Sequence, residues 1–90
     1  MASQEEVDRG REAELLLQNP VYADAWEGLR SDLIRDWAHT EPNDVNGRER
    51  LWIAVSLLEQ LQTKLVQTVN AGRMASEEFD SNRKPLTRHE

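Results

Sequence analysis

The stretch Leu51–Leu58 (Leu-Trp-Ile-Ala-Val-Ser-Leu-Leu) constrains the fold more than any other part of the chain. It holds eight residues without a charge, and Ser56 is the only polar one. Because an α-helix has about 3.6 residues per turn, this stretch covers every side of a helix. A helix that is apolar all round must be covered by several neighbours, and a chain of 90 residues has few elements to supply them. We therefore expect the core to continue into a second copy or a partner.

The chain lacks two of the usual supports of a small fold. Small domains usually need disulfides, metals or oligomerisation in addition to their core. There is no cysteine, and the two histidines lie fifty positions apart, so disulfides and thiolate or histidine metal sites are not expected. The four glycines are isolated, so there is no Gly-rich phosphate loop either. The sequence therefore predicts a homo-oligomer without a cofactor.

Negative charge is concentrated in the first half of the chain. Residues 1–46 hold eleven acids and four arginines, a net charge of −7, whereas residues 47–72 hold two acids and three basic residues, a net charge of +1. Affinity for nucleic acid comes largely from clustered Lys and Arg. We therefore expect no direct nucleic-acid binding over a broad surface. The one candidate phosphate contact is Arg48 with Arg50, whose alternative role is pairing with acids of the preceding helix or the tail.

The sequence shows neither a membrane span nor a secretory signal. No apolar run reaches the roughly 18 residues that a membrane span needs. The N-terminus, Met-Ala-Ser-Gln-Glu-Glu, is acidic, whereas a secretory signal is basic and then apolar. We expect a cytoplasmic protein that does not enter a membrane.

Two patterns place the first helix. Ser3 with Glu6 three residues later is a capping box, which predicts a helix start. Gly10 weakens this helix, so we expect a frayed first half and a docked second half around Leu16. Asn19-Pro20 ends it, because a proline disfavours helical geometry in the residue before it.

Pro20 also suits the first position of a second helix, with Asn19 as its cap. One face of this helix is apolar and aromatic, and the opposite face is rich in acids. Its apolar residues, at spacings of three and four, are Tyr22, Trp26, Leu29, Leu33 and Trp37.

A third helix follows a loop that runs from His39 to Gly47. Asn46 with Glu49 predicts its cap, and Gly72 predicts its end. Its 4-3 spacing of apolar residues favours packing against an antiparallel neighbour. This seam consists of Leu51, Val55, Leu58, Gln62, Leu65 and Val69. Residues 73–90 lack periodicity and mix charges, which is typical of a disordered tail.

We therefore predict an all-α fold, in which a short N-terminal helix packs on an antiparallel hairpin of the second and third helices. The helical domain spans residues 1–72, and residues 73–90 form a flexible polar tail. The predicted core is Leu16, Tyr22, Trp26, Leu29, Leu33, Trp37, Leu51, Val55, Leu58 and Leu65. The predicted interface with a second copy or a partner is Trp52, Ile53, Leu57 and Leu61.

The side chains that could carry chemistry are scattered. Asp32 with Asp36, and Glu5 with Asp8, have the spacing of metal ligands on a helix, but neither pair has a third ligand nearby. Ser56 lies in the apolar run, where its hydroxyl is expected to bond back to a carbonyl one turn earlier. We therefore expect no enzyme and no catalytic or metal site.

Two segments resemble parts of a known class of proteins. They are Gly47–Leu58 with its continuation to Asn70-Ala-Gly72, and Leu17-Gln-Asn-Pro-Val-Tyr with the amphipathic helix after it. They are similar to short acidic proteins of the head-assembly and DNA-packaging region of tailed bacteriophages, over about residues 9–75. The resemblance implies a non-enzymatic helical protein that acts in virion assembly, in the host cytoplasm or the virion.

Small packaging-enzyme subunits belong to the same class, and they commonly form rings and recognise DNA through a helix-turn-helix. This chain departs from that pattern, because its second helix is acidic on one face and aromatic on the other. We therefore expect a structural or assembly factor that works by helix-mediated association. The alternatives are a DNA-packaging accessory protein and an acidic inhibitor or adaptor directed at a host protein.

Overall fold

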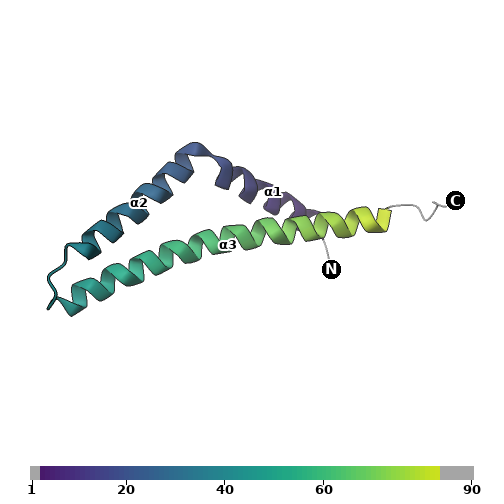
Figure 1. The fold of residues 1–90 in the computed structure, drawn as a ribbon. Coiled ribbons are helices and arrows are strands. Elements are labelled where there is room, and N and C mark those ends of the chain that lie inside the picture. The colour runs from purple at the N-terminus through teal and green to yellow at the C-terminus, as the bar shows by residue number, and fades with distance from the viewer. Residues whose placement is uncertain (1–2, 84–90) are drawn as a thin grey trace. The chain divides into compact units, whose positions relative to one another are not determined.

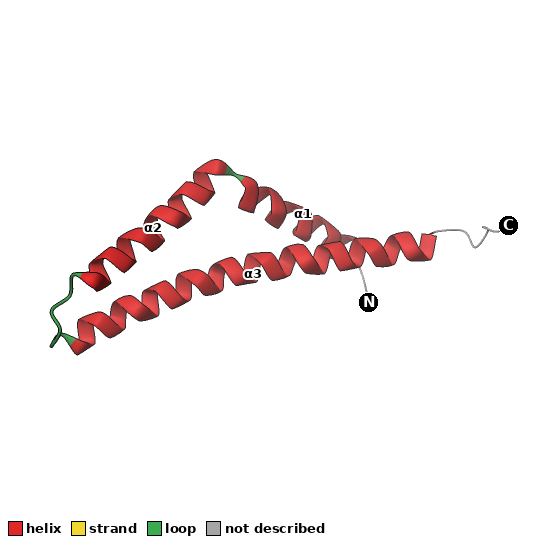
Figure 2. Ribbon diagram, in the orientation of Figure 1, coloured by secondary structure: helices red, strands yellow, loops and turns green. Residues whose placement is uncertain are grey.

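The computed structural model of the chain describes residues 3–83, which form three α-helices and no strand. Helix α1 spans Gln4–Gln18, α2 spans Pro20–Ala38 and α3 spans Val45–Arg83 (Figure 1). Figure 2 shows that short loops join these helices. The predicted all-α fold is confirmed. Residues 1–2 and 84–90, which include the end of the predicted tail, lie outside the described residues.

The predicted starts of α1 and α2 are confirmed by their hydrogen bonds. The backbone N–H of Glu6 donates to Ser3 Oγ at 3.1 Å, and the N–H of Ser3 donates to Glu6 Oε1 at 3.1 Å, which completes the capping box. At α2, Asn19 Oδ1 accepts from the N–H groups of Val21 and Tyr22 at 2.9 and 3.0 Å. These bonds satisfy donors that a helix leaves unpaired at its N-terminus.

The start of α3 differs from the prediction. Asp44, not Asn46, is the capping residue, because Asp44 Oδ1 accepts the backbone N–H of Gly47 at 3.0 Å. The helix therefore begins at Val45 and includes the last residues of the predicted loop. Asp44 and Asn46 both have side chains that cap helices well. The sequence pattern favoured Asn46 because Glu49 follows it three residues later.

The end of α3 also differs from the prediction. Gly72 lies inside the helix and has no positive φ, and the helix continues to Arg83. The predicted end of the third helix at Gly72 is therefore wrong, and residues 73–83, which were assigned to the tail, are helical. Glycine is common after helix ends because it adopts left-handed backbone geometry easily, but it also permits close contact between helices, and Gly72 has that second role.

The chain divides into two compact units. Within the described residues, the first, called the glycine unit, consists of residues 3–16 and 65–83, and the second, called the hairpin unit, consists of residues 17–64. Helix α3 passes through both, since residues 45–64 belong to the hairpin unit and residues 65–83 belong to the glycine unit.

In the glycine unit, Gly10 of α1 and Gly72 of α3 bring the two backbones together. A Cβ atom added at Gly10 would lie 2.6 Å from Gly72 Cα, and one added at Gly72 would lie 2.7 Å from Gly10 Cα. The same added atoms would lie 3.1 Å from the carbonyl oxygens of Thr68 and Glu6. Each glycine therefore faces a carbonyl of the other helix, an arrangement in which Cα–H···O contacts recur.

Small residues extend this contact along both helices. They repeat every three residues and are all buried: Val7, Gly10 and Ala13 on α1, and Val69, Gly72 and Ala75 on α3. The predicted frayed first half of α1 is therefore wrong, because that half packs closely. The predicted docking of Leu16 is wrong as well, since its side chain is 41% exposed.

In the hairpin unit, α2 and the first part of α3 run antiparallel, which confirms the predicted hairpin. The indole Nε1 of Trp26 donates to the carbonyl oxygen of Leu58 at 3.2 Å. The guanidinium of Arg30 and the carboxylate of Glu59 form an ion pair at 2.9 Å. Both contacts join the middle of α2 to the end of the apolar run of α3.

The core of the hairpin unit is thin. Val55 is its only buried residue, and no residue of α2 is buried. In the predicted core, the half-buried residues are Tyr22, Trp26, Leu33, Leu51, Leu58 and Leu65. Leu29 and Trp37 are exposed, contrary to the prediction. The apolar stripe of α2 is too wide for one neighbouring helix to cover.

Candidate interaction surface

The acids with metal-ligand spacing are held in ion pairs or side-chain hydrogen bonds. Arg35 contacts Asp32 at 3.2 Å and Asp36 at 3.9 Å. Glu5 pairs with Arg9 at 3.1 Å, and Asp8 accepts a hydrogen bond from the side chain of Gln4. Among residues 3–83 no three potential ligands gather at one place. These carboxylates therefore form an exposed charged surface.

The two arginines of the candidate phosphate contact have different environments. The Arg48 guanidinium lies 4.4 Å from the centre of the Trp37 ring, and its Nη1 donates to Thr40 Oγ1 at 3.0 Å. Arg48 therefore ties the start of α3 to the end of α2 through a cation–π contact. Its partners are not the acids that the sequence suggested. Arg50 is exposed and forms no hydrogen bond or ion pair with the described residues.

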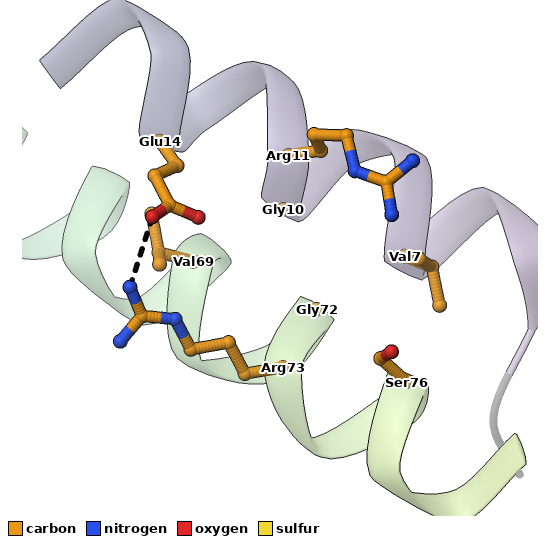
Figure 3. Close-up of a pocket in the computed structure, with 8 residues that line it drawn as sticks. All are labelled: Val7, Gly10, Arg11, Glu14, Val69, Gly72, Arg73 and Ser76. Atoms are coloured by element: carbon orange, nitrogen blue, oxygen red, sulfur yellow. Dashed lines mark hydrogen bonds and ion pairs between the residues drawn. The ribbon is translucent and has the colours of Figure 1, made fainter. Parts of the chain in front are cut away.

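A shallow pocket of about 110 Å³ lies beside the glycine contact, between α1 and the last part of α3 (Figure 3). Its lining residues are Val7, Gly10, Arg11, Glu14, Val69, Gly72, Arg73 and Ser76. Arg73 and Glu14 bridge the two helices at 3.0 Å. The pocket is therefore a groove between two packed helices that this ion pair bridges.

Large apolar side chains are exposed along most of the described chain. They are Leu15, Leu16, Val21, Leu29, Ile34, Trp37, Val45, Trp52, Ile53, Leu57, Leu61, Val66 and Met74. Most of them belong to the hairpin unit. Single exposed apolar residues are normal on a protein surface, but a contiguous group of them marks a site of interaction.

The four residues of the predicted interface are all exposed, but they do not share one face. Ile53, Leu57 and Leu61 are 50, 59 and 48% exposed and follow each other at spacings of four, so they form one stripe along α3. Trp52 is 61% exposed. At about 100° per residue it lies on the opposite side of the helix from Leu61. A single flat partner surface therefore cannot cover all four.

The ion pair between Arg30 and Glu59 identifies one side of the hairpin. Viewed along α2, Arg30 lies on one side of Trp26. Leu29 lies on the other side, about 60° around the helix from Trp26. Viewed along α3, Glu59 lies on one side of Leu58. Leu61 lies on the other side, about 60° around the helix from Leu58. Exposed apolar residues thus gather on the side away from this ion pair. We call this set the apolar flank: Ala25, Leu29, Leu57 and Leu61.

Part of this surface was missed by the sequence reasoning. Leu29 was assigned to the core because it falls on the apolar face of α2, and only the hairpin geometry shows that it stays exposed. The glycine contact was missed as well. Its signal was present, since α1 and α3 each carry a valine, a glycine and an alanine at spacings of three.

Comparison of the chain with protein-family models, curated proteins and solved structures finds no match. Within the described residues, no helix has the length and apolar character that crossing a membrane requires.

Proposed function

We propose that this chain is a non-enzymatic helical protein that associates with copies of itself and acts as an assembly factor, as its resemblance to bacteriophage head-assembly proteins implies. The association surface is the stripe Ile53–Leu57–Leu61 of α3 with the neighbouring apolar residues of α2.

One observation carries this proposal. The hairpin unit buries Val55 alone, while three large side chains of one α3 stripe are about half exposed or more. Short helices in water depend on tertiary packing for most of their stability. A 19-residue helix without a buried residue, such as α2, therefore gains much from a second surface.

The size of the available effect supports association. Complete burial of a Leu or Ile side chain contributes about 1.5–3 kcal/mol. Three such residues on each of two copies, about half exposed in the single chain, supply several kcal/mol. Association costs on the order of 4–15 kcal/mol, because the two copies lose translational and rotational freedom. The stripe alone is therefore too small for tight binding, and residues of α2 must contribute.

The alternative of a DNA-packaging accessory is less favoured. Arg48, half of the candidate phosphate contact, already stacks on Trp37 and donates to Thr40. Arg50 remains as a single exposed cation beside an acidic helix, and one such contact gives little affinity for nucleic acid.

The proposal predicts that Leu57→Glu disrupts the oligomer. A charge in the centre of the stripe would have to be desolvated in the interface. We expect the unmodified chain to have a mass in solution that is a multiple of 10.4 kDa, and the variant to have the mass of one chain with its helical content kept. Light scattering with circular dichroism measures both quantities.

Thr63→Glu is the matched control, because Thr63 is exposed on α3 about 120° around the helix from Leu57 and the substitution adds the same charge. We expect this variant to keep the mass of the unmodified chain. An unmodified chain with the mass of one copy contradicts the proposal. A Leu57→Glu chain with an unchanged mass shows that this stripe is not the interface.

A further inference from the structure

We propose that the apolar flank is covered by the apolar flank of a second copy, so that α2 of each copy lies antiparallel along α3 of the other. This inference rests on the proposed self-association and adds which helix faces which. The resulting dimer is a four-helix arrangement in which every α3 has two α2 neighbours, its own and that of the partner copy.

The charges along α3 argue against a parallel contact between two α3 helices. Arg50 lies seven residues before Leu57, close to the same side of the helix. If two α3 helices met in parallel at Leu57, Arg50 of each copy would face Arg50 of the other copy. Like charges that face each other across an interface disfavour this arrangement.

The charges along α2 favour it as the partner of α3. Asp32 and Asp36 follow Ala25 and Leu29 of the apolar flank by seven residues each, so they lie on the same side of α2. Arg35 contacts both carboxylates. Two acids thus share one cation, and this part of α2 keeps a negative charge with which a cation from another helix can pair.

The register of the hairpin brings these opposite charges together. The hydrogen bond from Trp26 to Leu58 sets which residues of two antiparallel helices lie level. Arg50 is eight residues before Leu58, and Ile34 is eight residues after Trp26. An α2 helix of the second copy in this register places its residue 34 level with Arg50, between its two aspartates.

The same register matches the apolar residues. Leu57 is one residue before Leu58, so it lies level with the residue after Trp26. That position is between Ala25 and Leu29 of the second copy. The small side chain of Ala25 leaves room for a leucine, which favours interdigitation of the two helices.

Cross-linking between two differently tagged chains tests this arrangement. The natural chain has no cysteine, so single cysteines can be introduced without background. One chain carries Leu61→Cys and the other carries Ala25→Cys, and the mixture is oxidised. The control replaces Ala25→Cys with Asp24→Cys, which is one residue away but lies about 100° around α2 from Ala25 and about 140° from Leu29. Light scattering of the unmodified chain accompanies the experiment.

We expect the pair of Ala25→Cys and Leu61→Cys to cross-link several-fold more than the control pair. It should also exceed the cross-linking of Leu61→Cys with itself. Dominant cross-linking of Leu61→Cys with itself would show that α3 faces α3, which overturns the arrangement but leaves self-association intact. An oligomer that gives no cross-link in any pair also overturns it. A chain with the mass of one copy overturns both this arrangement and the proposed function.

Discussion

The two units of this chain use opposite ways of joining helices. In the glycine unit, the buried residues are valines, alanines and glycines, and two backbones touch at Gly10 and Gly72. In the hairpin unit, large side chains meet across the helices, yet only Val55 is buried. Small residues let helices approach closely, so that few side chains suffice to close a contact. Large residues on two helices cover each other only in part, so much of their apolar surface stays exposed.

Polar groups show the same difference. The hairpin unit contains two buried polar side-chain atoms without a hydrogen-bond partner, Tyr22 Oη and Gln62 Oε1. A buried polar group without a partner costs about 1–3 kcal/mol. In the glycine unit, the charged pair that crosses the helices, Glu14 with Arg73, is exposed and matched at 3.0 Å. Among the described residues, the buried polar side-chain atoms without a hydrogen-bond partner therefore lie in the hairpin unit.

The substitutions with the largest expected effect disrupt the contact between Gly10 and Gly72. We predict that Gly72→Ala or Gly10→Ala destabilises the protein by about 1–3 kcal/mol, the usual cost of forcing an extra carbon into a packed contact. The added Cβ atom meets backbone atoms, which cannot move aside as a flexible side chain can. Thermal unfolding followed by circular dichroism measures the loss, at about 4–8 °C per kcal/mol for a chain of this size.

Gly28→Ala is the matched control for this prediction. A Cβ atom at Gly28 meets nothing within 4 Å, and the residue is exposed inside α2. Because alanine is the better helix former, we expect this substitution to stabilise the protein by about 0.5–1 kcal/mol. If all three substitutions stabilised the protein, the two backbones would not be in contact in solution.

A smaller effect is expected in the hairpin unit. Trp26→Phe keeps an aromatic ring but removes the indole N–H that donates to the Leu58 carbonyl. The loss of one such hydrogen bond costs about 0.5–1.5 kcal/mol. Denaturant unfolding of Trp26→Phe and of Trp52→Phe gives the comparison, since Trp52 is mostly exposed. Equal stability of the two variants would mean that the Trp26 hydrogen bond does not hold the hairpin together.

The sequence predicted the helices better than it predicted their packing. Ser3, Asn19 and the spacing of apolar residues identified the three helices and the hairpin, because caps and periodicity are local properties. The third helix was predicted to begin and end at the wrong residues. Asp44 and Asn46 are both good caps, and the role of Gly72 depends on what lies opposite it.

The residues that meet in space were harder to predict. Leu16 and Leu29 fit a core by their type, but each lies at a position that no neighbouring helix covers. Hydrophobic periodicity identifies a face of a helix, whereas the width of the neighbouring surface decides how much of that face is buried. All four residues of the predicted interface are exposed, but Trp52 lies on a different side of α3 from Ile53, Leu57 and Leu61.

The central claim is that the glycine unit closes its own contact, whereas the hairpin unit is completed by a second copy. Hydrogen exchange of the backbone amides at a low and a high concentration of the chain tests it most directly. We predict that the amides of α2 exchange more slowly at the high concentration, while those of α1 keep the same rate. Rates in α2 that do not change with concentration, or that change equally in α1, would contradict the claim.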